Sequence, residues 1–409
     1  MPGALADVKI LDLTWVLSGP YAAMVLCDLG AEVIKVERPP YGDVARTTGP
    51  YINGESSYFF SINRGKKSML LDLKQPEGRD LFLRLVEKVD VVMENFTPGT
   101  MDGLGLGYEA LSARNPRLIY AATSGFGQTG PDRLKPALDV VVQGMGGVMS
   151  ITGEEGGKPV RPGLSLGDIA AGLFTAIGIL AALHERERSG RGQMIDISML
   201  DCQVAILENA FARYFATGVP PKPIGTRHPV STPFQAFPTA DGQIVIALGF
   251  GLENVWGLFA ATIDRPELID DPRYATPGSR TQNHATLEPI LNEALMARPT
   301  AEWLAEFEAL GIPCGPLQTI PEVAQHPQIQ AREMLQDVES ARGNKLRISN
   351  TPLKLSRTPA AIRGGPPVVG ADTREVLSSL LGLTDAQIDE AYARGAAVEG
   401  KDLPSEITS

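Results

Sequence analysis

Residues 8–38, VKILDLTWVLSGPYAAMVLCDLGAEVIKVER, place a helical pattern between two short apolar runs. The runs at 8–13 and 33–36 are rich in Val, Ile and Leu, as buried strands are, and residues 20–29 have the composition and spacing of a helix. A strand, a helix and a second strand at this spacing predict a βαβ unit with two parallel strands. This stretch therefore sets the fold class as α/β.

The same alternation continues along the next hundred residues. A helical pattern at 77–88 leads into an apolar run at 89–93, and a further β-rich run covers 118–123. These segments predict an open, parallel, Rossmann-like sheet in a large domain. Residues 234–237 and 244–248 instead predict a strand pair across Asp241-Gly242 with amphipathic helices after it, which indicates a smaller α+β domain.

Two proline-rich stretches, near residue 218 and at 350–367, separate these parts. Prolines and glycines at this density are typical of linkers. We therefore predict the N-terminal part of the large domain at 1–217, a linker at 218–233, the small domain at 234–330, a return linker at 331–367, and C-terminal helices at 368–409 that pack on the large domain.

The composition is that of an acidic globular protein. Its 409 residues include 37 Lys and Arg against 48 Asp and Glu, a net charge of −11, and the mean hydropathy is −0.02. This acidity argues against a nucleic-acid partner or an anionic membrane partner. The three cysteines, Cys27, Cys202 and Cys314, form neither a disulfide framework nor a zinc spacing, so we expect a cytoplasmic protein without a structural metal. The apolar stretch at 169–183 is shorter than the roughly 20 residues of a membrane span and predicts a buried core helix.

Two nucleotide-binding motifs are absent or incomplete. Residues 14–20 follow the first predicted strand but lack the G-x-G-x-x-G pattern, which disfavours a dinucleotide. Residues 65–68, GKKS, resemble the end of a P-loop without its first glycine. Cations still gather in this part of an acidic chain, and they predict either solvated surface charge or contacts to the phosphate groups of a ligand. They are Lys35, Arg38, Arg64, Lys66 and Lys67.

Residues 163–167, GLSLG, match the G-x-S-x-G nucleophile elbow of α/β-hydrolases. An elbow serine follows a hydrophobic strand, whereas residues 156–162 contain two glycines and two prolines where ladder hydrogen bonds are needed. A serine hydrolase is therefore the weaker alternative.

Asp168 stands immediately before the apolar stretch at 169–183. We expect it at the N-cap of that helix, where its carboxylate accepts free backbone N–H groups. A capping role alone is one interpretation. The other is nucleophilic catalysis, because a carboxylate beside a helix dipole stays ionised at neutral pH, and Gly163, Gly167 and Gly172 leave room for a bulky acyl group.

Several segments together resemble the class III CoA-transferases, the family of formyl-CoA transferase and carnitine CoA-transferase, over essentially the whole chain. Residues 54–59 and the segment GTRHPVSTPFQAF (225–237) are most similar to the enzymes that move CoA between succinate-type dicarboxylates, of the glutarate kind. The other matching segments are ILDLTWVLSGPYAAMVLCDLGAEVIKVERP (10–39), SINRGKKSMLLDLKQPEGRDLF (61–82), ENFTPGTMDGLGLGYEAL (94–111), TSGFGQTGP (123–131) and GLSLGDIAAGLFTAIGILAALHERERSGRGQMIDISMLD (163–201).

The resemblance implies that Asp168 is the nucleophile. Its carboxylate would attack the donor thioester, for which succinyl-CoA is the expected substrate, and form an acyl-aspartyl anhydride and then an aspartyl-CoA thioester. A carboxylic acid, expected to be dicarboxylic, would take CoA by the reverse steps. CoA thioesters are thus substrates, and neither a metal nor a permanently bound cofactor is expected. Gly249 and Gly251 fall in the loop that the family closes over the site, which would protect the anhydride from water.

Further residues are assigned to the substrates, those for the acceptor from its chemistry and those for CoA from the resemblance. A second acceptor carboxylate must be paired, because burying it unpaired is costly, and the candidate partners are Arg46, Arg227 and His228. Gly103 and Leu17 replace an arginine and a glutamine of the formyl-CoA transferases, which argues against formyl or oxalyl groups. The positions that match CoA-binding residues are Val16, Arg38, Leu71, Lys74, Asn95, Phe96 and Lys135.

Two further implications concern a related enzyme and the assembly. The α-methylacyl-CoA racemases keep the aspartate but add a histidine where Leu138 stands here, and since leucine cannot carry a proton, a racemase is a weaker alternative. His184 or His228 would have to replace that histidine.

The family also forms an interlocked homodimer, in which each chain passes through the open ring of the other and the large domain of one faces the small domain of its partner.

Overall fold

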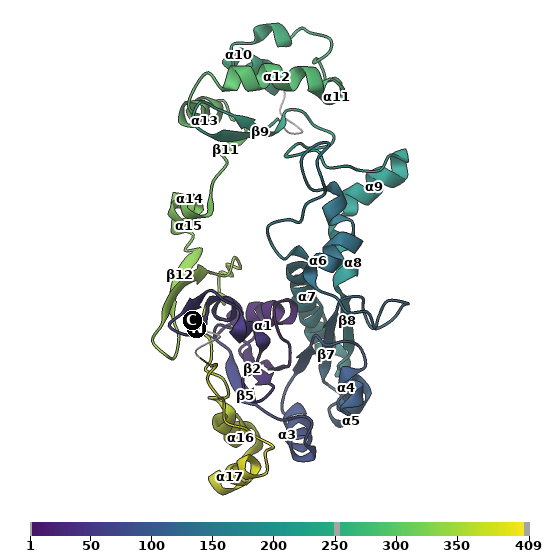
Figure 1. The fold of residues 1–409 in the computed structure, drawn as a ribbon, viewed down its shortest axis with the longest axis vertical. Helices are drawn as coiled ribbons and strands as arrows, with labels where there is room; N and C mark the ends of the chain where they lie inside the picture. Colours follow the sequence, from purple (N-terminus) through teal and green to yellow (C-terminus); the bar gives the residue numbers. More distant parts are fainter. Residues whose placement is uncertain (1, 249–253, 405–409) are drawn as a thin grey trace. The chain divides into compact units, whose positions relative to one another are not determined.

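The computed structural model describes residues 2–248 and 254–404. The chain divides into two compact units (Figure 1), which we call the large unit (Met1–Val148, Arg161–Ala216 and Pro327–Ser409) and the small unit (Met149–Val160 and Thr217–His326). The small unit takes up the segment predicted as a linker at 218–233. It also contains residues 149–160, which the sequence analysis placed in the large domain.

A six-stranded parallel sheet forms the centre of the large unit, in the order β5-β2-β1-β6-β7-β8. Every neighbouring pair is parallel, so the predicted βαβ unit and open parallel sheet are confirmed. The strand order reverses between β1 and β6, and open sheets of this kind bind ligands outside the carboxyl ends of the strands at such a point. The strands are β1 (Lys9–Asp12), β2 (Glu32–Glu37), β5 (Lys67–Leu70), β6 (Val91–Glu94), β7 (Ile119–Ser124) and β8 (Met194–Ser198), with a short separate pair, β3 (Tyr51–Ile52) and β4 (Glu55–Ser56).

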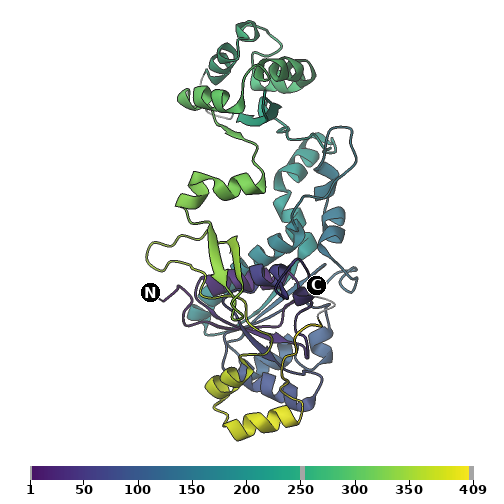
Figure 2. The same ribbon diagram turned by 60° about the vertical axis from the view of Figure 1, so that its left-hand side comes forward.

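The sheet has a different hydrophobic core on each face, because successive residues of a strand point to opposite sides. Leu11 and Ile34 belong to the core shared with α3 and α5, whereas Ile10 and Val33 belong to the core shared with α1 and α7. Figure 2 shows helices on both faces of the sheet. The helices up to residue 217 are α1 (Ser18–Asp28), α2 (Ser57–Ile62), α3 (Pro76–Val86), α4 (Thr100–Gly103), α5 (Tyr108–Arg114), α6 (Asp139–Met145), α7 (Leu166–Ser189), α8 (Met199–Ile206) and α9 (Glu208–Thr217).

Helix α7 is longer at both ends than the predicted stretch at 169–183. By length and composition it could cross a membrane, with a mean hydropathy of 2.0 over an 18-residue window, half of which is buried. One face is a core face, as expected, where Gly172 comes close to Ser18 and Tyr21 of α1. Another face leaves an apolar stripe exposed, made of Leu173, Phe174, Ile177 and Leu180.

Three of the cations noted in the sequence are neither solvated nor available to phosphate, so both interpretations are wrong for them. Each is almost fully buried and forms an ion pair with an aspartate that is equally buried. Uncompensated charges would be too costly inside this part of the molecule, so each cation requires its partner. The pairs are Lys35 Nζ with Asp43 Oδ2 at 2.9 Å, Arg64 Nη2 with Asp28 Oδ2 at 2.6 Å, and Lys66 Nζ with Asp12 Oδ2 at 2.9 Å.

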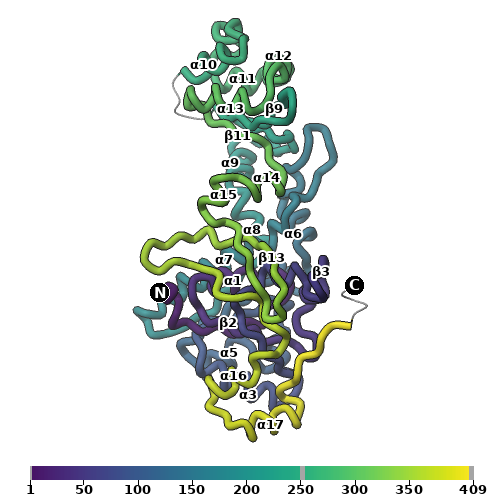
Figure 3. Tube along the Cα trace, turned by 90° about the vertical axis from the view of Figure 1, so that its left-hand side faces the viewer, coloured from purple at the N-terminus to yellow at the C-terminus, as the bar shows by residue number. Residues whose placement is uncertain are grey.

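The last part of the chain returns to the large unit. Residues 331–367, predicted as a linker, contain a hairpin of β12 (Leu335–Glu339) and β13 (Lys345–Ser349), which packs on Phe60 of α2 (Figure 3). A short helix, α15 (Pro327–Ala331), precedes it. Two further helices, α16 (Thr373–Leu381) and α17 (Asp385–Ala393), contribute Val376 and Ile388 to the core shared with α3.

The small unit is built on an antiparallel sheet in the order β11-β10-β9. The predicted strand pair is confirmed as β9 (Phe234–Pro238) with β10 (Gln243–Ala247), and the sequence analysis missed the third strand, β11 (Cys314–Pro316). The aromatic side chains of Phe259, Trp303 and Phe307 lie in its core. Its helices are α10 (Val255–Thr262), α11 (Pro277–Gln282), α12 (His284–Leu295), α13 (Thr300–Ala309) and α14 (Ile320–Gln325).

Candidate active site

The segments expected at CoA follow four neighbouring strands of the large unit. Val16 follows β1, Arg38 follows β2, Leu71 follows β5, and Asn95 and Phe96 follow β6. Because these strands are parallel, all five residues lie at the carboxyl edge of the sheet. That edge is where open α/β sheets bind ligands.

These residues differ in what they can offer a ligand. Arg38 and Lys74 are exposed cations. Leu71 is 1% exposed, so neither its side chain nor its backbone faces solvent here. Lys135 lies between β7 and α6, and its ammonium is 2.7 Å from Asp132. A side chain at Gly103 would meet open space.

Sequence reasoning missed Trp15, which lies in the turn between β1 and α1. Its indole is 44% exposed, and its ring centroid is 6.3 Å from that of Phe96, with 53° between the ring planes. Two aromatic rings at the carboxyl edge offer the apolar face that an adenine needs. The signal in the sequence was an aromatic residue in the first βα turn.

Asp168 lies in the first turn of α7 but not at its N-cap, so that expectation is wrong. The helix begins at Leu166, and Ser165 is the N-cap residue without a capping side-chain hydrogen bond. Asp139 of α6 provides the acceptor instead, because the Gly167 N–H donates to its Oδ1 at 2.9 Å. Among residues 2–248 and 254–404, none donates a hydrogen bond to the Asp168 carboxylate.

The surroundings of Asp168 raise its pKa to about 7. Burial is the largest cause and the negative charge of Asp139 is the second, while the Arg161 guanidinium opposes both. Arg161 Nη2 lies 2.9 Å from Asp139 Oδ2 and donates to Ser165 Oγ at 3.0 Å. The expectation that Asp168 is fully ionised at neutral pH is therefore wrong. Both the carboxylate and the neutral acid are therefore populated around neutral pH.

Asp168 lies near the turn between β1 and α1. It is one helical turn before Gly172 on the same face of α7, and Gly172 approaches Ser18 and Tyr21 at the start of α1. Tyr58 of α2 is also close, since burial and the charges of Asp168, Asp43 and Asp139 raise the pKa of its phenol to about 12. Tyr58 therefore keeps its proton at neutral pH.

The residues expected to hold an acceptor carboxylate already have partners. Arg46 Nη2 lies 2.8 Å from Glu37 Oε1, and the Arg46 guanidinium stacks on Phe59. Burial alone would raise the pKa of Glu37, but its contacts, of which Arg46 is the strongest, lower it to about 2. In the small unit, Arg227 pairs with Glu155 and the His228 ring packs on Phe234. Gly249 and Gly251 lie outside the described residues.

The geometry of the site supports neither a serine hydrolase nor a racemase. Ser165 follows irregular backbone and not a strand, so the G-x-S-x-G match lacks the elbow context. Leu138 is 70% exposed at the start of α6 and has no ionisable group. His184 is on the same helix as Asp168 but about 24 Å further along it, too far for a shared proton transfer.

The large unit has a parallel sheet with ligand-facing segments at its carboxyl edge. It also has a carboxylate at the head of α7 that accepts no hydrogen bond from any residue in the described part of the chain. This arrangement is typical of α/β enzymes. The chain belongs to CoA-transferase family III, which it matches over residues 5–373, and it is a CoA-transferase.

Three relatives show how close the similarity is. The chain is 39% identical over 392 residues to succinyl-CoA:glutarate CoA-transferase of Mus musculus, covering 96% of this chain and 89% of the relative. It is 45% identical over 334 residues to acetyl-CoA:oxalate CoA-transferase of Acetobacter aceti, covering 81% and 85%. The crystal structure of a CAIB/BAIF family protein from Brucella suis has a TM-score of 0.83 and 38% identity, over 93% of this chain and 100% of that chain.

The charges around Asp168 predict opposite pH shifts in two variants. In the wild type, kcat/KM should rise with pH through about 7 as the Asp168 carboxylate forms. Arg161→Gln removes the cation that stabilises the carboxylate, so the rise should move to higher pH. Asp139→Asn removes the repelling charge and keeps an acceptor for Gly167, so the rise should move to lower pH.

The measurement is a pH profile of kcat/KM from pH 5.5 to 9. Arg188→Gln, at the far end of the same helix, is the matched control and should leave the profile unchanged. A wild-type profile without a rise, or two variants that shift in the same direction, would show that Asp168 is not the group that titrates.

Proposed function

We propose that Asp168 carries CoA from an acyl-CoA donor, with succinyl-CoA as the first choice, to a dicarboxylic acid. This proposal rests mainly on the state of the Asp168 carboxylate. It is half-buried and accepts no hydrogen bond from the described residues. A carboxylate that caps no helix and pairs with no cation retains its lone pairs for attack on a carbonyl carbon.

The proposed exchange conserves the thioester energy in covalent bonds. The Asp168 carboxylate attacks the donor thioester carbonyl, the C–S bond breaks, and CoA leaves as a thiolate. The thiolate then attacks the Asp168 carbonyl of the anhydride, which forms an aspartyl-CoA thioester and releases the donor acid as its carboxylate. The acceptor carboxylate attacks this thioester, and the released thiolate attacks the acceptor's carbonyl, which regenerates Asp168.

CoA would lie along the carboxyl edge of the sheet. In the proposal, the rings of Trp15 and Phe96 supply an apolar face for the adenine, and the exposed cations Arg38 and Lys74 lie at the ends of neighbouring strands for the phosphates. Lys135 is a third cation for this purpose. Gly249 and Gly251 are proposed as the loop that covers the anhydride.

The acceptor is proposed to be a dicarboxylate, because the mouse relative is named for glutarate and the Acetobacter relative for oxalate. Because one relative is named for oxalate, oxalate is included among the acceptors to be tested, although Leu17 and Gly103 argue against oxalyl groups. Arg161 is the preferred cation for the second carboxylate, since its charge acts on Asp168. It too is paired, with Asp139, but its side chain is 38% exposed, against 13% for Arg46 and 11% for Arg227. Arg46 would first have to leave Glu37, and Arg227 would have to leave Glu155.

The assembly is proposed to be an interlocked homodimer in the cytoplasm. The exposed stripe of α7 supports a protein partner, because contiguous apolar side chains on one helix face are unfavourable in water. The interlocked form itself rests on the family resemblance. All three cysteines are free, as expected in a reducing compartment.

Asp168 should become covalently modified during turnover. Protein incubated with succinyl-CoA and quenched with hydroxylamine should carry a hydroxamate on the peptide that contains Asp168, detected by mass spectrometry. Asp168→Ala should show neither the mark nor transfer. The matched control is Asp201→Ala, which removes the aspartate at the same first-turn position of α8 and should retain wild-type transfer. Wild-type turnover by Asp168→Ala would contradict the mechanism.

The acceptor class is tested with a panel of acids at pH 8.5, where Asp168 is ionised in the wild type. With succinyl-CoA as the donor, oxalate, glutarate and mesaconate should have higher kcat/KM than acetate and butyrate. Arg161→Gln should lower kcat/KM for dicarboxylates about tenfold to a hundredfold relative to monocarboxylates, since a charge-assisted hydrogen bond contributes roughly 1.5 to 3 kcal/mol. The ratio cancels any effect on Asp168 itself. A preference for monocarboxylates would refute the acceptor class, and an unchanged ratio would refute the role of Arg161.

A further inference from the structure

The turn between β1 and α1 contains a strained residue. Val16 has φ +63°, in the left-handed region that a β-branched residue adopts only under constraint. Many ligand-binding turns after a first strand use glycine for such backbone. Here no glycine stands between Asp12 and Ser18, so other groups must hold the turn.

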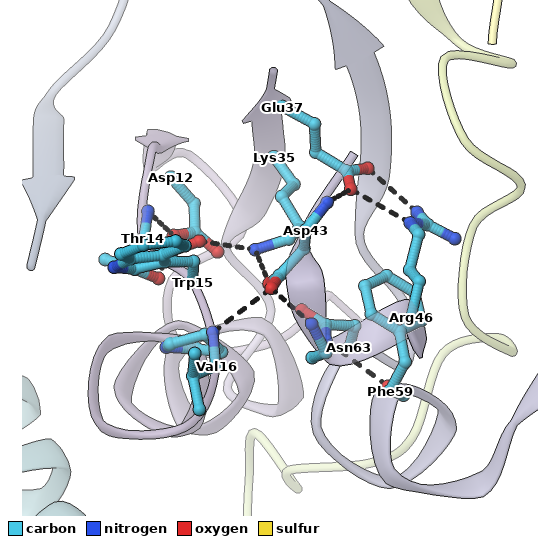
Figure 4. Close-up of polar contacts among 12 residues, drawn as sticks. Asp12, Thr14, Trp15, Val16, Lys35, Glu37, Asp43, Arg46, Phe59 and Asn63 are labelled. Atoms are coloured by element: carbon cyan, nitrogen blue, oxygen red, sulfur yellow. Dashed lines mark hydrogen bonds and ion pairs between the residues drawn. The ribbon is translucent and has the colours of Figure 1, made fainter. Parts of the chain in front are cut away.

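Side chains from β1 and β2 hold the first residue of this turn (Figure 4). The Thr14 N–H donates to Asp12 Oδ1 at 2.9 Å. The Thr14 carbonyl accepts from Lys35 Nζ at 2.6 Å. Both side chains are fully buried, so this attachment is shielded from water.

Asn95 and Asp43 hold the next two residues. The Trp15 N–H donates to Asn95 Oδ1 at 2.9 Å, and Asn95 Nδ2 donates back to the Trp15 carbonyl at 2.9 Å. The Val16 N–H donates to Asp43 Oδ1 at 3.2 Å. The Trp15–Asn95 pair joins the ends of β1 and β6, the two strands between which the strand order reverses.

Asp43 is the most constrained member of this set. Its Oδ2 lies 2.9 Å from Lys35 Nζ, and both side chains are 1% exposed. Its Oδ1 also accepts from the Ala45 N–H at 2.9 Å, and its own N–H donates to Glu37 Oε2 at 2.8 Å. Asp43 therefore cannot move away from Val16 without breaking several buried contacts.

We propose that Asp43 and Asn95 are positioning residues that fix the turn at Trp15 and Val16 in its ligand-binding conformation. Asn95 acts through Trp15, because both ends of its amide are already bonded to the Trp15 backbone. Fixing the turn before binding removes the cost of ordering it afterwards, so the benefit is in affinity for CoA. This inference rests on the proposed function, in which CoA binds at this turn.

The test uses purified full-length protein and steady-state kinetics with succinyl-CoA. Asp43→Asn and Asn95→Ala should each raise the KM for succinyl-CoA about tenfold, with kcat changed less than about threefold. Val16→Gly is measured as its own reference, because glycine adopts positive φ without strain and leaves Asp43 and Asn95 less to hold in place. In the double variants Asp43→Asn/Val16→Gly and Asn95→Ala/Val16→Gly, the KM should fall back by at least threefold from that of the single variant, a coupling that independent sites do not show.

The matched control is Asn115→Ala. Asn115 is half-buried like Asn95 and donates to the carbonyls of Val86 and Val89 at the opposite edge of the sheet. It should lower the melting temperature without changing the KM. Asp43→Asn leaves the buried Lys35 without its ion-pair partner, whereas Asn95→Ala leaves no charge unpaired. Asn95→Ala therefore still tests the proposal if Asp43→Asn does not fold.

The outcomes separate this inference from the proposed function. If the wild type and Asn115→Ala transfer CoA and the KM of Asn95→Ala is unchanged, the positioning role is refuted. A raised KM that Val16→Gly does not restore also refutes it, because the residues would then act by another route. If the wild type itself neither binds CoA by calorimetry nor transfers it, the proposed function fails instead.

Discussion

The hydrogen bond from the Gly167 N–H to Asp139 Oδ1 separates two tasks that one aspartate would otherwise combine. A helix N-terminus needs an acceptor for its free N–H groups, and Asp168 is placed to provide one. Because Asp139 provides it from α6, Asp168 is half-buried and accepts no hydrogen bond from residues 2–248 and 254–404. Burial and the charge of Asp139 then raise its pKa to about 7, so the ionised form is more basic than an ordinary aspartate.

At the start of α1, too, a backbone segment is held by side chains from other elements. The backbone of the turn there is held by side chains from β1, β2, the loop after β2 and the end of β6. Buried ion pairs such as Lys35 with Asp43 make these contacts rigid, since a charge that lost its partner in this interior would be costly. Both ligand-facing segments of the large unit thus depend on polar side chains that come from elsewhere in the fold.

From the pattern of residues, the sequence predicted structural features that are local along the chain. The βαβ unit at 8–36 follows from the spacing of apolar residues, and the family resemblance identified the chain as a class III CoA-transferase. The ion pairs of Lys35, Arg64 and Lys66 were not predictable, because their partners are eight to fifty-four residues away and a list of cations does not show burial. The capping of α7 by Asp139 was missed for the same reason. The hairpin at 335–349 was missed because the proline-rich residues after it dominated the interpretation.

The central claim is that folding disfavours the charge on Asp168, and the melting temperature of Asp168→Asn against pH tests it most directly. The folded-state pKa of about 7 lies above the ordinary value of 3.8, so the wild type carries a penalty that is absent below about pH 4, grows as pH rises, and is complete above pH 7. Asparagine cannot ionise and avoids it. We expect equal melting temperatures near pH 4 and a higher melting temperature for Asp168→Asn than for the wild type at pH 8. A variant less stable than the wild type at pH 8 would mean that the Asp168 carboxylate stabilises the fold, as a cap or an ion pair would, and would contradict the account.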